Sequence, residues 1–218
     1  MKADQLFTEA DQQAIQAAVR EAEERTSGEI VPYVVDQSDE YPTAVWKGAA
    51  LGALLGPLVA LAIYEWGGHW NLHVPLWIAV PAPAGGALGY LLTWWLPALR
   101  RWMAGDEVLE ARSLRRAEAA FLEQEVFRTR DRTGILLFLS LFEHRAIVLG
   151  DSGINQKVEQ GKWDEIVRNL AAGVRTGRPG AAMVEAIRTC GELLERHGVE
   201  RRTDDRDELS NELRRGTD

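Results

Sequence analysis

The chain has 218 residues, of which 46% are hydrophobic and 27% charged, with a formal net charge of −8 at pH 7. This acidity excludes a general nucleic-acid-binding protein, because such a protein needs a basic surface to neutralise phosphates. Cys190 is the only cysteine, so the chain cannot form an internal disulfide, which suits a reducing compartment. We expect no signal peptide, since Met1–Arg25 is charged and lacks an apolar core segment.

The first predicted elements are a helix and a strand. Thr8 has the side chain of a helix N-cap, and acidic residues follow it in the first turn. The apolar face of this helix consists of Ile15, Ala18, Val19 and Ala22. Glu29–Val35 is typical of a strand, and Pro32, which has no N–H, favours an edge position or a strand with one free side.

Two uncharged apolar stretches, Gly48–Tyr64 and Leu72–Leu99, occupy the middle of the chain. A spanning helix needs about 20 apolar residues, so the first stretch lies at the lower limit and the second is long enough even when tilted. Pro81 and Pro83 should kink or shorten the second stretch. We therefore predict a two-helix transmembrane hairpin that interrupts a soluble domain.

The basic residues around this hairpin predict its orientation. Lys47, Arg100 and Arg101 flank its outer ends, whereas Glu65–His73 contains no lysine or arginine. By the positive-inside rule, both termini and the soluble domain lie in the cytoplasm, and the protein resides in the inner (cytoplasmic) membrane.

Two alternatives stay open for these helices. The stretches could form a buried hairpin in a soluble protein, although charge-free runs of this length are unusual in so small a core. Glycines that allow close helix approach recur in both stretches. They are Gly48, Gly52, Gly56, Gly85, Gly86 and Gly89. These small faces could pack within the hairpin or mediate self-association between protomers.

The segment after the hairpin predicts a long helix over Asp106–Arg128 and then two strands, Gly134–Leu141 and Arg145–Leu149. Two further helices are predicted over Trp163–Val174 and Ala181–His197. Because the first strand must bury its faces against the later ones, we predict one three-layer α/β/α sandwich closed across the insertion. The boundaries are 1–45 and 104–198 for this domain, 46–103 for the hairpin and 199–218 for a charged, disordered tail.

Three carboxylates form a candidate metal site. If the two later strands form an antiparallel hairpin, Asp131 lies near Asp151. If the first strand runs parallel to Gly134–Leu141, Glu29 enters at the same end of the sheet. Hard cations such as calcium take 6–8 oxygen ligands of this kind. The alternative is that both aspartates are turn or cap residues and that Glu29 is a solvated charge.

Other groups of residues are weaker candidates for a functional site. Arg128, Arg130 and Arg132 could hold a phosphate, or could instead favour the dipole at a helix C-terminus. An aspartyl nucleophile at Asp151 lacks the second aspartate that such phosphatases use. His69 and His73 are four residues apart in a tryptophan-rich segment, where an interfacial loop explains them better than a metal does.

Three stretches carry a family resemblance: EAEERTSGEIVPYVV, RTRDRTGILLFLSLFEHRAIVLGDSGI and GRPGAAMVEAIRTCGELL. In order and spacing they resemble the TPM-domain family, which includes thylakoid-lumen proteins, photosystem II repair proteins and bacterial membrane proteins. The resemblance covers both soluble flanks and omits the hairpin. Most relatives carry a terminal anchor instead, and Pro32 replaces their usual apolar strand residue.

The resemblance implies a Rossmann-like α/β/α sandwich with a divalent-cation site, usually calcium, which would draw on Asp131, Asp151 and Glu29 here. We therefore expect a membrane-anchored, calcium-binding interaction or accessory module for the assembly or maintenance of a membrane-protein partner. The alternative, also implied by the resemblance, is a metal-dependent acid phosphatase of low activity. The sequence does not identify the partner or substrate.

Overall fold

The computed structural model describes residues 6–66, 79–197, 199 and 209–216. The chain divides into two compact units, which are Met1–Ser38 together with Glu110–Asp218, and Asp39–Leu109. The first is referred to below as the α/β unit and the second as the insertion unit. The insertion unit thus begins and ends several residues outside the segment 46–103 that the sequence assigned to it.

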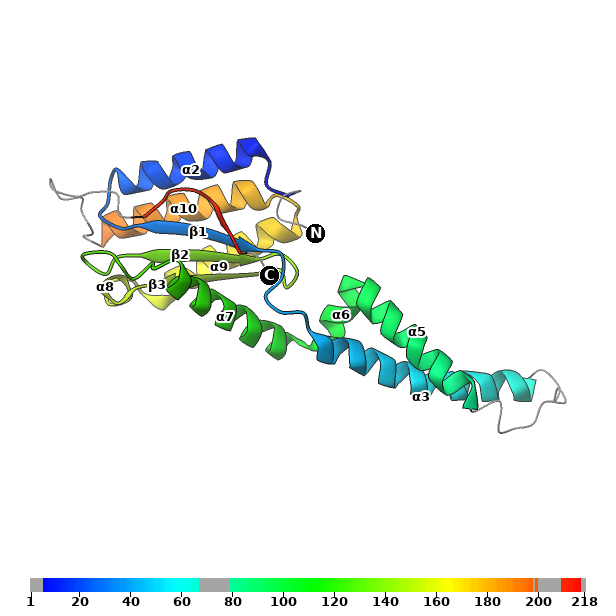
Figure 1. Cartoon of the computed structure of the whole chain (residues 1–218). Helices are drawn as coiled ribbons and strands as arrows, with labels where there is room; N and C mark the ends of the chain where they lie inside the picture. The colour runs from blue at the N-terminus through cyan, green and yellow to red at the C-terminus, as the bar shows by residue number, and fades with distance from the viewer. Residues whose placement is uncertain (1–5, 67–78, 198, 200–208, 217–218) are drawn as a thin grey trace. The chain divides into compact units, whose positions relative to one another are not determined.

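The α/β unit contains a four-stranded mixed sheet in the order β3-β2-β1-β4 (Figure 1). The strands are β1 (Ile30–Val35), β2 (Ile135–Ser140), β3 (Arg145–Gly150) and β4 (Arg214–Arg215). β1 pairs parallel with β2, with Ile30 opposite Ile135, and β2 pairs antiparallel with β3. The predicted mixed α/β class is confirmed, and the two strand arrangements on which the candidate site depended, a parallel first pair and an antiparallel hairpin, are both present.

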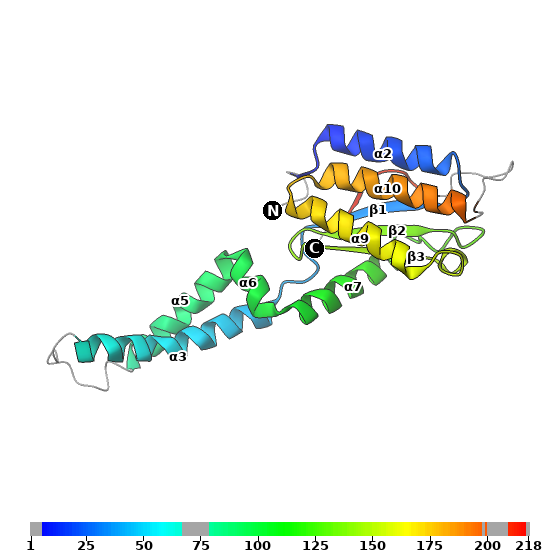
Figure 2. The same cartoon turned by 180° about the vertical axis from the view of Figure 1, so that it is seen from behind.

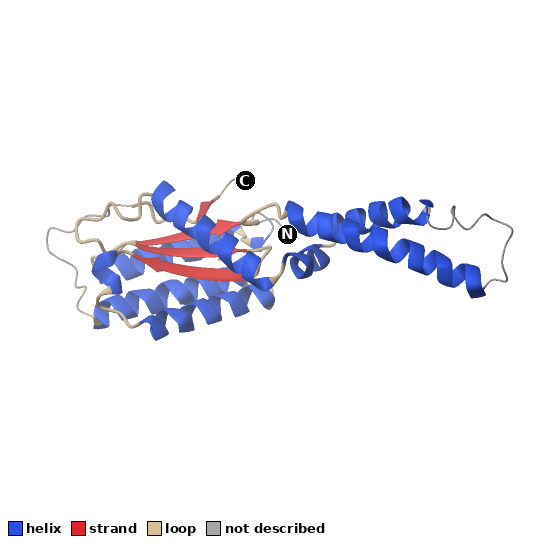
Figure 3. Ribbon diagram, turned by 90° about the horizontal axis from the view of Figure 1, so that it is seen from below, coloured by secondary structure: helices blue, strands red, loops and turns tan. Residues whose placement is uncertain are grey.

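Helices lie on both faces of this sheet (Figures 1 and 2). They are α2 (Glu9–Glu23), α7 (Asp106–Glu123), α8 (Ser152–Asn155), α9 (Gln160–Arg175) and α10 (Pro179–Arg196). In the view coloured by secondary structure, the strands lie between these helices (Figure 3). The helix starts follow local rules, since Thr8 and Asp11 form a reciprocal capping box at α2 and Pro179 occupies the first turn of α10.

The core is divided by the sheet into two clusters. Every residue of β1 and β2 is buried, and successive side chains alternate between the two faces. Val34 and Leu137 belong to the cluster with α2, α9 and α10, whereas Tyr33 and Phe138 belong to the cluster that contains Ala117 of α7. Continuous apolar runs, such as ILLFL in β2, result from this coverage on both faces.

Pro32 occupies an inner strand, at a point where one side of that strand has no ladder partner among the described residues, which is the second of the two positions that the sequence favoured. Ile135 donates to the Glu29 carbonyl and Leu141 to the Val35 carbonyl. Because hydrogen bonds alternate along a parallel ladder, the Pro32 nitrogen faces the β4 side. Among the described residues, β4 pairs only with Tyr33 and Val34, so no ladder donor is needed at Pro32.

The chain beyond Val199 contributes to the sheet, whereas the sequence predicted a disordered tail over 199–218. Arg214 and Arg215 form β4 and pair parallel with Tyr33 and Val34. The Gly216 amide continues this pairing by donating to the Val34 carbonyl at 3.0 Å. The prediction of disorder is therefore wrong for this short strand.

The insertion unit consists of α3 (Pro42–Trp66), α5 (Pro81–Trp95) and α6 (Pro97–Ala104). α3 and α5 are antiparallel, because Gly48 meets Gly89 whereas Gly56, further along α3, meets Pro81. A Cβ added at Gly52 would overlap the carbonyl group of Gly85. The glycine faces thus pack within the chain, which is the first of the two alternatives that the sequence left open.

The second apolar stretch differs from its prediction. Its described helix, α5, has 15 residues and ends at Trp95, and the C-cap residue Leu96 has a ψ of 100°. Leu96 leaves the helical region because Pro97 follows it, and the residue before a proline is disfavoured in the α conformation. Within the described part of the chain, α3 alone is long and apolar enough to cross a membrane. Part of the predicted span, from Leu72 to Ile78, lies outside the described residues.

Candidate cation site at the amino end of the sheet

The two aspartates of the candidate site lie at the same end of the sheet because the β2–β3 hairpin brings their segments together. The Asp151 amide donates to the Gly134 carbonyl at 2.9 Å, and the Gly153 amide donates to the Arg132 carbonyl at 3.0 Å. Gly153 must be glycine here, since a Cβ would lie 2.5 Å from the Asp131 carbonyl oxygen. The segment from Asp131 to Gly134 therefore lies directly against the start of α8.

The residues just before β1 lie at the same end of the sheet as Asp131 and Asp151, as the sequence predicts. The Thr133 hydroxyl donates to the Ser27 carbonyl at 2.8 Å, and the Ile135 amide donates to the Glu29 carbonyl at 2.8 Å. The Glu29 side chain is buried, with 6% of its surface exposed. The third predicted ligand is therefore a buried carboxyl and not the solvated strand-edge charge of the alternative interpretation.

Asp151 is the best-defined group of the three. It is buried and caps α8, with its Oδ1 accepting from the Ser152 amide at 2.6 Å. Its Oδ2 forms an ion pair with Arg132 Nε at 2.7 Å. The capping role, which the sequence left as an alternative, is present, and the Arg132 ion pair was not foreseen. A cation at Asp151 would compete with the Arg132 guanidinium for Oδ2.

Asp131 differs from the other two candidate residues because it is exposed. Arg132, which follows it, has a positive φ of 57°. Within the described ranges, no group of three or more His, Cys, Asp or Glu side chains is arranged to hold a metal ion. The backbone thus brings Asp131, Asp151 and Glu29 to one end of the sheet, but their carboxylates do not form one cluster. His69 and His73 lie outside the described residues.

The arginines that could hold a phosphate have other partners. Arg128 pairs with Glu125 at 2.7 Å, on an exposed part of the surface. Arg132 pairs with Asp151, and its guanidinium lies 5.9 Å from the centroid of the Phe127 ring. Two of the three guanidinium groups are therefore engaged by carboxylates rather than directed at a shared anion position.

A buried polar cluster at the opposite end of the sheet escaped the sequence analysis. Glu143 Oε1 accepts from the Ser38 amide at 2.8 Å, and its Oε2 accepts from the Ser140 hydroxyl. The Ser38 hydroxyl lies 2.9 Å from that of Ser140 and 3.4 Å from that of Ser113. Ser113, Ser140 and Glu143 are buried. The only local signal was a glutamate in a tight turn three residues after a serine.

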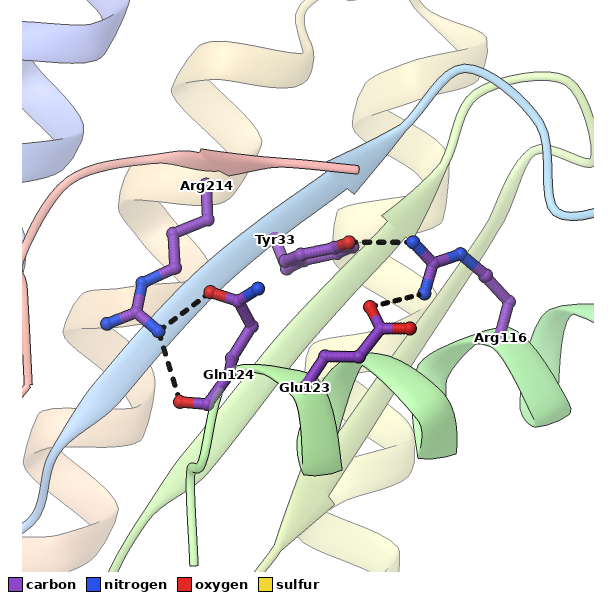
Figure 4. A network of polar contacts seen from close by, with 5 residues as sticks. All are labelled: Tyr33, Arg116, Glu123, Gln124 and Arg214. Carbon is purple, nitrogen blue, oxygen red and sulfur yellow. Dashed lines mark hydrogen bonds and ion pairs between the residues drawn. The ribbon is translucent and has the colours of Figure 1, made fainter. Parts of the chain in front are cut away.

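A second network connects β1 to α7 and to the C-terminal segment (Figure 4). The Tyr33 hydroxyl accepts from Arg116 Nη2 at 2.8 Å, and Arg116 Nη1 pairs with Glu123 at 3.1 Å. Arg214 donates to both the carbonyl and the side-chain oxygen of Gln124, at 3.2 and 2.9 Å. Burial raises the pKa of Tyr33 above its usual value, although the nearby positive charge of Arg116 opposes the shift.

Comparison with known proteins identifies the fold alone. No family model matches the chain, and no curated protein matches it. The chain is similar to the NMR structure of the BA42 protein from the psychrophilic bacterium Bizionia argentinensis, with a TM-score of 0.60 and 19% identity over 99% of each chain. At this level of identity, the two proteins share an architecture, and no site residue carries over.

Proposed function

We propose that this chain is an integral protein of the inner (cytoplasmic) membrane whose α/β unit serves as an interaction or accessory module for a membrane-protein partner. The observation that carries the proposal is α3. This helix has 25 residues and only 11% of its most apolar window is buried. At 1.5 Å per residue it reaches about 37 Å, which exceeds the roughly 30 Å hydrocarbon core of a bilayer.

The side chains of α3 suit lipid better than water. Large apolar residues are exposed along it, including Leu54 (68%), Leu58 (60%) and Ile63 (57%). No charged residue occurs between Lys47 and Glu65. In water, an exposed apolar surface of this extent would promote aggregation, whereas lipid chains would cover it. α5 would return the chain to the side on which α3 begins, which gives the two-span anchor that the sequence predicts.

Both outer ends of the anchor carry positive charge. Lys47 Nζ donates to the Met103 carbonyl at 3.1 Å, so the start of α3 lies beside the end of α6. Arg100 and Arg101 belong to the same short helix. By the positive-inside rule, this end and both termini would face the cytoplasm. A topology reporter fused after Asp218 should be active as a cytoplasmic fusion, and a periplasmic signal would contradict this orientation.

The α/β unit would bind a divalent cation, most readily calcium, through Asp151 and Asp131, with Glu29 nearby. The support is the shared position of these residues and the resemblance to TPM domains. Calcium titration of the full chain in detergent tests the site. Asp151→Asn should abolish binding, and Arg132→Ala should tighten it, because the guanidinium no longer competes for Oδ2. Binding that persists in both Asp131→Asn and Asp151→Asn would refute the site.

We favour a non-enzymatic role over acid phosphatase activity. A phosphatase needs cations that stabilise the phosphate, and Arg128 and Arg132 are already paired with Glu125 and Asp151. Phosphate-ester turnover that is lost in Asp131→Asn and Asp151→Asn would overturn this preference.

A further inference from the structure

The C-terminal segment Leu209–Gly216 is held against the outer side of β1 by few contacts. Its strand, β4, has two residues, and none of the eight residues of the segment is buried. β1, by contrast, is buried along its whole length. A hollow of about 340 Å³ lies between the segment and α2, lined by Gln12, Glu212 and neighbouring side chains. The segment therefore covers a well-formed strand edge without becoming part of the core.

The contacts that hold the segment are mostly polar. The Asn211 side chain donates to Glu23 at 2.7 Å, Arg214 donates twice to Gln124, and the Gly216 amide donates to Val34. A hydrogen bond of this kind contributes little net stability, because water replaces it when the segment leaves. Ordering each residue costs conformational entropy, which opposes this gain. The bound and released states of the segment are thus close in free energy.

The surface that contacts this segment restricts the residue type more strictly at some positions of the segment than at others. Leu213 packs against the cluster that contains α2 and α10. A Cβ at Gly216 would lie 2.6 Å from the Tyr33 hydroxyl and 2.7 Å from Val35 Cγ1, so a side chain there requires these buried residues to shift. Arg215 is exposed, so its contacts do not restrict the residue type at this position. The surface therefore selects the pattern Asn-x-Leu-Arg-x-Gly in an extended strand.

We propose that the outer edge of β1 is a peptide-binding site, occupied in this chain by its own C-terminal segment, which an extended segment of a protein partner displaces. The partner segment adds a strand to the sheet. It carries an apolar residue at the Leu213 position, an arginine at the Arg214 position and a glycine at the Gly216 position. This inference names the kind of partner for the interaction role proposed above and rests on that role.

The test uses the full chain in detergent and two fluorescent peptides. One has the sequence of residues 209–218, LSNELRRGTD, and the matched control replaces its glycine with valine. The first peptide should bind a Gly216→Val chain at least about tenfold more tightly than the wild-type chain, because the variant's own segment no longer fits. The control peptide should bind neither chain. An Arg214→Ala chain provides a second variant, since it weakens the segment without a steric clash.

The inference is overturned if both peptides bind equally, if neither binds the Gly216→Val and Arg214→Ala chains, or if these variants bind no more tightly than the wild type. The assay contains no bilayer and no added calcium. Its failure would therefore leave the membrane and cation proposals standing, whereas their failure would not alter the measured peptide affinities.

Discussion

Gly52 of α3 and Gly85 of α5 face each other so closely that a Cβ on either one would overlap the carbonyl group of the other. This contact lets the two helix backbones approach, as small residues do between membrane helices. Gly52→Ala should destabilise the insertion unit by about 1–3 kcal/mol through overpacking, measured as thermal unfolding in detergent.

Gly86 provides the matched control for this prediction. A Cβ there would lie 3.3 Å from the Ala53 side chain, a tight contact that a small shift relieves. Gly86→Ala should be neutral or slightly stabilising, because alanine favours a helix over glycine by about 1 kcal/mol. Equal losses in the two variants would contradict the close packing at Gly52.

The ion pair between Arg132 and the buried Asp151 should contribute more than the exposed pair between Arg128 and Glu125, although both span 2.7 Å. Arg132→Ala leaves a buried carboxylate with less compensation, and we expect a loss of about 1–2 kcal/mol, limited by the exposure of the guanidinium. Arg128→Ala should cost less than about 0.5 kcal/mol. Urea denaturation of both variants checks the difference, and similar midpoints would disprove it.

Glu143 should be more important for folding than its place in a turn suggests. Glu143→Ala leaves the Ser38 amide and the buried Ser140 hydroxyl without their acceptor, which costs about 1–3 kcal/mol for each buried group that finds no other. Glu110→Ala is the control, because that carboxylate is 70% exposed where it pairs with Arg145. If the two variants unfolded at the same denaturant concentration, the cluster would have no stabilising role.

The stability of the α/β unit should fall in alkaline solution partly because of Tyr33. Burial raises the pKa of this hydroxyl above 10.0 in the folded state. Above pH 10 the unfolded chain loses this proton first, so the folded state loses stability as the pH rises from 10 through the raised value. Denaturation between about pH 9 and 11 should show a smaller decline for Tyr33→Phe. Parallel declines would rule out this contribution.

The elements with strong local patterns were predictable from the sequence. The N-cap residue Thr8 predicted the start of α2, and the apolar run Gly134–Leu141 predicted the strand β2. The pairing of β1 with the later strands followed from the need of a lone strand to bury its faces, and the antiparallel β2–β3 hairpin placed Asp131 and Asp151 at one end of the sheet. Cys190 is buried in the core, where burial raises the pKa of its thiol to about 12.

The remaining features depend on partners distant in the chain. Glu143 is buried because Ser38, 105 residues upstream, supplies its amide. Arg214 and Arg215 form a strand without an apolar pattern, through contacts with Tyr33, Val34 and Gln124. The end of α5 was predictable from Pro97, because the residue before a proline is disfavoured in the α conformation. The sequence analysis instead treated Leu72–Leu99 as one stretch, because apolar residues lie on both sides of Leu96-Pro97.

Membrane insertion through α3 is the central claim, and alkaline carbonate extraction followed by flotation in a density gradient tests it most directly. Carbonate strips peripheral proteins, and flotation separates membranes from aggregates. We predict that the full chain remains with the floating membranes after carbonate treatment and is released by detergent. Recovery of the chain in the carbonate supernatant would contradict the claim, and would instead favour a soluble protein that covers the apolar surface of α3 by other means.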